Sequence, residues 1–242
     1  MSTSTGMRAS ARVRAHARWE LRLLLRNGEQ ILLMFVIPIA LLVALVVMRR
    51  SEIDTQVPIV MTVSLIATCF TSLAIGTGFE RRSGALTFLA TTPLSRVDLL
   101  LGKAIATAAL ASLSIAVLAL VAAMMGWRPN AQWPVLVLFI VVGGGAFAAL
   151  AVLLAGVLRA EAVLALANAI FVLLIVFGGV VFAAADMPSA IGQVVSLLPS
   201  AALADALQSA LNGGAFPLGP LLVLVAWGTA AAMLARRTFT WD

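Results

Sequence analysis

The sequence predicts an all-α integral membrane protein with six transmembrane helices. Of its 242 residues, 62% are hydrophobic and only 11% are charged, whereas soluble proteins average about 45–50% and about 25%. A soluble domain of this size cannot hide so much apolar surface in its core. The apolar residues also form runs of about 20 residues, the length that a helix needs to cross a bilayer. Strands of a membrane barrel are half as long and alternate in polarity, so helices are favoured.

The apolar runs divide the chain into a cytoplasmic arm with an interfacial helix, residues 1–29, and a six-helix transmembrane domain, residues 30–242. Charged residues close several of the runs, including Arg49-Arg50 after the first run and Arg236-Arg237 after the last. The six predicted spans cover residues 30–48, 57–78, 103–125, 133–158, 162–185 and 216–235.

The basic residues predict the orientation of the chain. If the N-terminus is cytoplasmic, thirteen of the sixteen Lys and Arg residues fall on the inside and three on the outside. This split follows the positive-inside rule and places both termini in the cytoplasm. The first apolar run is 19 residues long and no A-x-A-like site follows it. We therefore expect it to remain in the mature protein rather than to be cleaved as a signal peptide.

The N-terminal arm carries a helical stripe of arginines, which recur every fourth residue from Arg14 to Arg26. Trp19 lies away from this stripe, so the arm is expected to form a helix along the cytoplasmic membrane surface. Glu20 interrupts the pattern because it falls on the apolar side. The alternative is a positively charged flank that only sets the topology. The predicted interfacial residues are Arg18, Trp19, Arg22 and Arg26.

The connection between the second and third spans, residues 79–102, is longer than a simple turn requires. Residues 83–92 can form a short amphipathic helix, which Pro93 should end because the residue before a proline is pushed out of the helical region. Ser95 and Asp98 have the spacing of a capping box that starts the next helix. A short amphipathic helix between two spans is well suited to binding a partner protein.

The segment before the last span, residues 186–215, is too apolar for an exposed loop and too rich in Pro and Gly for a span. It predicts one or two short helices at the outer surface, partly re-entrant, with their backbone covered by protein or lining a cavity.

Small and polar residues within the spans have two readings. Glycine groups at 143–145 and 178–179 predict close helix contact, as does a ridge of small residues on the third span. Polar side chains at depth either line a substrate path or form hydrogen bonds between helices, and the second role is the commoner. The ridge consists of Ala104, Ala108, Ser112 and Ala116, and the polar residues are Thr62, Ser64, Thr68 and Asn168.

The sequence offers no catalytic residue, metal site or nucleic-acid partner. It lacks a phosphate-binding P-loop, and its only histidine, His16, lies in the N-terminal arm, away from any intramembrane serine. No two carboxylates share a span, which argues against an aspartyl protease or a proton pump. The basic residues form short clusters rather than a groove for nucleic acid. Such a protein needs external energy to move a solute.

Three stretches resemble the ABC-2 type permeases, the membrane subunits of a class of bacterial ABC exporters. The most specific stretch runs from Glu80-Arg81-Arg82-Ser83-Gly84 through Thr91-Thr92-Pro93-Leu94-Ser95-Arg96 to Gly102-Lys103. Residues 19–27 resemble the interfacial entry helix of the family, and residues 197–214 resemble its external helix. Asn27-Gly28 departs from the Asn-Pro of many members.

The resemblance implies that the 80–103 element contains a coupling helix, which inserts into a cleft of an ATPase subunit. Glu80 and Arg82 would then pair with charged ATPase side chains, while Phe88 and Leu89 fill the cleft. The implied coupling residues are Glu80, Arg81, Arg82, Gly84, Leu86, Phe88, Leu89, Thr92 and Pro93.

The resemblance also implies the partners and location of the chain. It would be a multi-pass protein of the bacterial cell membrane, in contact with membrane lipids. Two copies of an ABC ATP-binding subunit would bind ATP and Mg and hydrolyse the nucleotide, so this chain would be no enzyme and hold no cofactor. A second permease chain, identical or paralogous, would complete the dimer.

The predicted function is therefore ATP-driven export of an amphipathic small molecule, such as a drug or antibiotic, or of a lipid-like substrate. The absence of tyrosine and the 7% aromatic content argue mildly against a glycan path, because sugars stack on aromatic rings. The alternatives are a glycan exporter permease, a non-transporting membrane assembly or scaffold protein of the same family, and a stand-alone channel.

Overall fold

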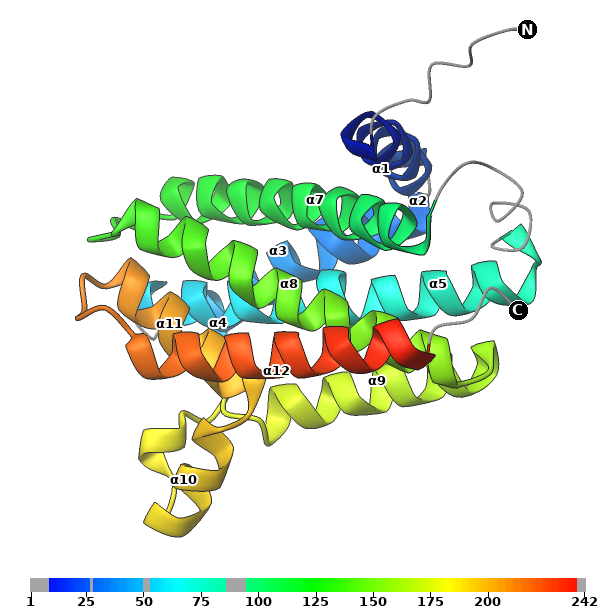
Figure 1. Ribbon diagram of the computed structural model, residues 1–242. Coiled ribbons are helices and arrows are strands. Elements are labelled where there is room, and N and C mark those ends of the chain that lie inside the picture. Colours follow the sequence, from blue (N-terminus) through cyan, green and yellow to red (C-terminus); the bar gives the residue numbers. More distant parts are fainter. Residues whose placement is uncertain (1–8, 27, 50–52, 86–94, 239–242) are drawn as a thin grey trace, which may run out of the picture.

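The computed structural model describes residues 9–26, 28–49, 53–85 and 95–238, and every regular element in these ranges is a helix. The predicted all-α class is confirmed for this part of the chain. Long helices run side by side, and α1 crosses α7 near the start of that helix (Figure 1). The first elements are α1 (Ala9–Arg26), α2 (Gly28–Ile31), the π-helix η1 (Leu32–Val36), α3 (Ile37–Arg49), α4 (Ile53–Ile66), the π-helix η2 (Ala67–Ser72) and α5 (Leu73–Arg82). The later ones are α7 (Arg96–Met124), α8 (Trp133–Val157), α9 (Ala160–Val176), η3 (Ala184–Asp186), α10 (Ser189–Ser196), α11 (Pro199–Leu211) and α12 (Leu218–Thr238).

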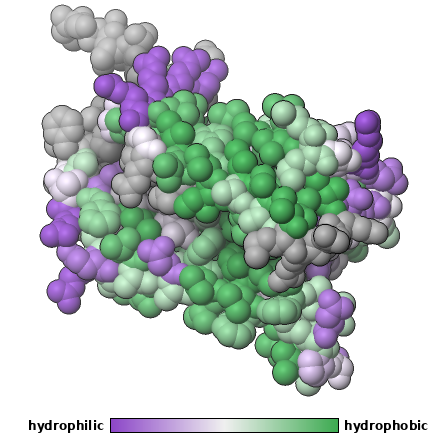
Figure 2. Space-filling view, turned by 180° about the vertical axis from the view of Figure 1, so that it is seen from behind, coloured by the Kyte–Doolittle hydropathy of each residue, from purple (hydrophilic) through white to green (hydrophobic). Residues whose placement is uncertain are grey.

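Four helices of the described chain are long and apolar enough to cross a membrane, namely 53–82, 98–124, 133–157 and 218–238. The bent pair of α10 and α11 makes a fifth if it is counted as one span. Two shorter apolar helices, Met34–Val47 and Ala160–Val176, lie in the predicted first and fifth spans. The count of six spans therefore remains a prediction. Figure 2 shows apolar side chains over the middle of the molecule and hydrophilic ones towards its ends, as a membrane protein requires.

The fifth predicted span is wrong at its far end, because α9 ends at Val176 and not at Ala185. Gly179 has a φ of +81°, a left-handed conformation that ends helices and that other residues rarely adopt. A side chain on Gly179 would also lie 2.6 Å from Cβ of Ala201 on α11. The predicted close contact at Gly178-Gly179 is thus confirmed, but the same glycines stop the helix.

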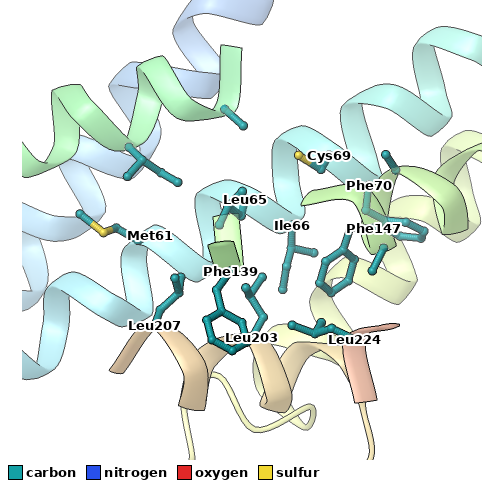
Figure 3. Close-up of a cluster of buried hydrophobic side chains, with 14 of the residues drawn as sticks. Met61, Leu65, Ile66, Cys69, Phe70, Phe139, Phe147, Leu203, Leu207 and Leu224 are labelled. Carbon is teal, nitrogen blue, oxygen red and sulfur yellow. The ribbon is translucent and has the colours of Figure 1, made fainter. Parts of the chain in front are cut away.

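The segment before the last span forms two short helices, α10 and α11, which meet at 88°. The prediction of short helices is confirmed, whereas their re-entry into the membrane stays a prediction. Helix α11 is largely buried and packs against α4, α8 and α12. Figure 3 shows Phe139 and Leu203 at the centre of this contact. Gly143 makes the contact possible, because a Cβ there would lie 2.6 Å from Leu203 Cδ1.

Of the predicted small-residue ridge of α7, only Ala104 packs against the apolar core of the described chain. Ser112 and Ala116 are exposed, and Ala104 and Ala108 are only half-buried. Instead, α7 packs inward through neighbouring positions such as Ala111 and Ile115. Within the described chain the predicted packing role is therefore confirmed only at Ala104, and for the other three residues it stays a prediction.

Candidate functional site

Charged side chains gather at the end of the bundle that carries α1, which we call the α1 end. The end of α5, the start of α7, the α8–α9 connection and the end of α12 lie at the same end (Figure 1). The opposite end, which carries α11 and which we call the α11 end, is closed by apolar packing. The predicted coupling segment starts and finishes at the α1 end, since it connects α5 to α7.

Lys103 of α7 is the centre of this charged region. Its side chain is only 1% exposed, yet its Nζ donates to Glu20 Oε1 at 2.6 Å and to Glu80 Oε1 at 2.7 Å. The three residues come from α7, α1 and α5, so one ammonium group joins three helices. A buried charge is tolerated only when it is paired, and removing one partner of such a pair is strongly destabilising. We call these three residues the Lys103 network.

A small cavity of about 50 Å³ lies beside the Lys103 network. Glu20, Glu80 and Lys103 line it together with Thr77, and the π-helices η1 and η2 contribute Met34 and Ser72. Glu20 Oε2 and Thr77 Oγ1 have no hydrogen-bond partner among the described residues. A polar cavity of this size suits ordered water, which satisfies such buried atoms. Departures from α-helical winding often mark functional places, and here two of them border the network.

Helix α1 packs closely on α7 through His16, Ala17 and Glu20, which are all buried. Gly102 permits this approach, because a side chain there would collide with the His16 ring. Burial lowers the pKa of His16 from its ordinary value by disfavouring the charged ring; Glu20 opposes this shift and Lys103 adds to it. The ring is therefore neutral at pH 7. Glu20, which interrupts the predicted apolar side of α1, is the residue that joins α1 to Lys103.

The predicted interfacial residues of α1 all lie on its exposed side. Arg18, Arg22 and Arg26 are exposed, and the Trp19 side chain is half-exposed while its ring stacks on His16 with centroids 5.9 Å apart. The arginine face of α1 is therefore exposed, and its opposite face, which carries His16 and Glu20, is buried against α7. Contact of this face with a membrane surface remains a prediction.

The start of α7 is fixed as predicted. Ser95 Oγ accepts from the Asp98 backbone N–H at 3.0 Å, and Asp98 Oδ2 accepts from the Ser95 N–H at 3.2 Å. This capping box is confirmed. Asp98 also pairs with Arg12 of α1 at 2.9 Å, which the sequence did not indicate. A second ion pair therefore joins α1 to α7, one turn or more before Lys103.

The coupling residues at the end of α5 have partners inside the chain. Arg81 Nη1 donates to the carbonyl oxygens of Ala155 and Gly156 at 2.8 and 2.9 Å and so caps the last turn of α8. Arg82 forms an ion pair of 2.6 Å with Glu161, although both side chains are largely exposed. Gly84 has a φ of +76° just after the helix ends.

Contact of these residues with an ATPase remains a prediction, but Glu80 already has Lys103 as an internal partner. The other predicted coupling residues lie outside the described residues: Leu86, Phe88, Leu89, Thr92 and Pro93.

The profile of ABC-2 family transporter proteins matches residues 50–236, more than half of the chain. The chain belongs to the ABC-2 transporter family. It is accordingly a multi-pass membrane protein and a permease, and permeases of this family generally work with an ATP-binding subunit. No protein of curated function matches the sequence. The matched range begins after α3, so the resemblance of residues 19–27 to an entry helix stays a prediction.

Three of the predicted substrate-path residues of the ABC-2 permease lie along α4 and η2, and the fourth, Asn168, lies on α9. Ser64 hydrogen-bonds to Ser114 at 3.0 Å, and Ser114 donates to the Met34 carbonyl at 2.8 Å. The Thr62 hydroxyl donates to the carbonyl of Pro58 in its own helix. These contacts favour the alternative reading, in which polar groups at depth form hydrogen bonds in and between helices. Thr68 is buried without a partner among the described residues, and Asn168 is exposed on α9.

The Lys103 network of the ABC-2 permease is the feature that sequence reasoning missed. No spacing rule connects Glu20 to Lys103, because the two residues are 83 positions apart. Two signals were nevertheless present, since Lys103 is the only lysine and Glu20 interrupts the apolar side of α1. A lone lysine beside an apolar run should therefore have been assigned a carboxylate partner.

Proposed function

We propose that this chain is the permease subunit of an ATP-driven exporter, with its α1 end in the cytoplasm. The observation that carries the proposal is the Lys103 network, which ties the end of α5 and the start of α7 to each other and to α1. These are the two helices between which the predicted coupling segment lies. A push on that segment would therefore move three helices together rather than bend one connection.

The proposed mechanism follows from this linkage. Two permease chains, identical or paralogous, work with two ATP-binding subunits, which hold ATP and Mg. When ATP closes the ATPases on each other, they push residues 83–92, and the motion passes through Glu80 and Lys103 into α5, α7 and α1. The predicted first, second and fifth spans then rotate and open a path between the two chains. An apolar surface suits an amphipathic drug or lipid-like substrate.

The test of this function is a change within the coupling segment. Leu89→Asp should abolish association with the ATP-binding subunit or uncouple ATP hydrolysis, because a charge replaces an apolar contact. The measurement is co-purification of the two subunits, followed by ATPase activity in reconstituted vesicles. Arg236→Gln, an exposed change at the same end, is the control and should behave as wild type. Normal export by the Leu89→Asp chain would contradict the docking assignment.

The substrate class needs separate experiments. A deletion strain should become sensitive to an amphipathic drug or antibiotic, and such compounds should stimulate ATP hydrolysis by the reconstituted complex. Stimulation by a lipid-linked glycan instead would support the glycan exporter. Failure to co-purify with any ATP-binding subunit would favour a non-transporting assembly role.

A further inference from the structure

A second cavity at the α1 end, of about 250 Å³, lies between the end of α5 and the start of α9. It is separate from the Lys103 network and shares no residue with the cavity beside it. Three arginines and one glutamate line it, which leaves an excess of positive charge. The lining residues are Gly78, Arg81, Arg82, Arg159, Ala160 and Glu161.

The three arginines differ in how firmly they are held. Arg81 is fixed by its two hydrogen bonds to the last turn of α8. Arg82 is paired with Glu161 at the surface, where such a pair is weak and exchangeable. The Arg159 side chain is exposed and forms no hydrogen bond or ion pair with the side chains of the described residues, while its backbone carbonyl accepts from the Val163 N–H. The cavity thus offers one fixed and two available guanidinium groups, and guanidinium groups match phosphate oxygens in geometry and charge.

The cavity also stands beside an exposed apolar surface. Phe79, next to Gly78, is 41% exposed, and Leu164, one turn along α9 from Ala160, is 40% exposed. Farther along the same helix, Val172 and Leu173 are both 55% exposed. A soluble anion would use only the arginines, whereas a lipid would place its headgroup in the cavity and its acyl chains along α9. Basic pockets between transmembrane helices bind anionic headgroups for this reason.

We propose that this cavity binds the phosphate-bearing headgroup of an anionic lipid, with Arg159 and Arg82 as the contacts and Arg81 as their fixed neighbour. Glu161 is a built-in competitor, because it holds Arg82 at 2.6 Å until a stronger anion displaces it. The site goes beyond the proposed function and does not depend on it, because lipid binding requires neither ATP nor an exported substrate.

The experiment measures lipid binding to the purified full-length permease in detergent by native mass spectrometry. Phosphatidylglycerol, phosphatidylcholine and glycerol 3-phosphate are titrated separately. Phosphatidylglycerol should bind saturably and more tightly than the other two. Arg159→Gln should weaken phosphatidylglycerol binding by about fivefold, because one arginine contributes about that factor in affinity for an anionic lipid surface. Glu161→Gln should strengthen it, and Arg159→Lys should keep most of it.

Two changes serve as controls. Arg236→Gln removes an exposed arginine at the same end and Arg128→Gln removes one on the α7–α8 connection, and neither should alter binding. The gain expected for Glu161→Gln cannot come from misfolding, so the proposal stays testable even if the Arg159→Gln chain is unstable.

Three results would overturn the proposal. Equal binding of phosphatidylglycerol and phosphatidylcholine would show that the cavity does not recognise the charge of the headgroup. If glycerol 3-phosphate bound as tightly as phosphatidylglycerol, the acyl chains would contribute nothing and the site would be one for a soluble phosphate. If the Arg159→Gln chain bound lipid as wild type does but no longer co-purified with the ATP-binding subunit, the cavity would be a contact site for that protein and not for a lipid.

Discussion

The two ends of the bundle differ in the contacts that hold their helices together. At the α11 end, Phe139, Leu203 and Leu207 are fully buried and meet through close apolar contact. At the α1 end, ion pairs centred on Lys103 and Asp98 join helices in addition to apolar packing. Apolar packing resists any displacement, whereas ion pairs keep their partners as one unit while that unit moves. From this difference we expect the α11 end to stay fixed while the helices joined by the Lys103 network move as one unit.

The largest expected effect comes from breaking the Lys103 network. Lys103→Met leaves Glu20 and Glu80 without their cation and should lower the free energy of unfolding by about 3–5 kcal/mol. It should also make α1 more sensitive to proteases, because the contact that ties α1 to α5 is lost. The measurements are denaturant unfolding in detergent and limited proteolysis.

A triple variant is the control for this loss. Lys103→Met, Glu20→Gln and Glu80→Gln together remove all three charges, so most of the lost stability should return. A triple variant as unstable as Lys103→Met alone would show that packing, and not charge pairing, holds this end.

A large effect of another kind is expected at the α11 end. Leu203→Ala should lower the free energy of unfolding by about 2–5 kcal/mol, since it opens a cavity in a well-packed core. Gly143→Ala should cost about 1–3 kcal/mol, because its methyl group would meet the Leu203 side chain.

These two changes should compensate each other. In a double-mutant cycle, the Gly143→Ala methyl group occupies space that Leu203→Ala vacates, so the combined loss should be smaller than the sum. Thermal unfolding of the four chains measures this coupling, and strict additivity would mean that the two residues do not touch. Ile191→Ala on exposed α10 is a matched control that should change little.

The smallest effect concerns pH and again belongs to the α1 end. The pKa of His16 is lowered by burial, with Glu20 and Lys103 facing the ring, so the folded protein binds a proton less readily than the unfolded chain. The stability contributed by neutral His16 is therefore complete above the ordinary pKa of about 6.5 and is lost as the pH falls below it. Unfolding measured from pH 7.5 to 5.5 should show this loss in wild type and a flatter profile in His16→Gln. Parallel profiles would contradict it.

Local features of this fold were predictable from the sequence, and distant contacts were not. The capping box of Ser95 and Asp98 spans four residues and was predicted, because its geometry depends only on one turn of the chain. The end of α9 was missed, because the apolar sequence continues past Val176. The helix stops where Gly179 packs closely against Ala201 of α11, a contact that the local sequence does not reveal. The Lys103 network was missed for the same reason, since its three members lie on three separate helices.

The most direct test follows the two parts of the permease while ATP is bound. Spin labels are placed at Leu23 of α1, Leu101 of α7 and Leu222 near the start of α12, all exposed, after Cys69, the only cysteine, is replaced by alanine. Distances are measured in the complex with the ATP-binding subunit, with and without trapped nucleotide. We expect an unchanged distance from Leu23 to Leu101 and a changed distance from Leu23 to Leu222. A nucleotide-dependent change between Leu23 and Leu101, or no change in either distance, would contradict it.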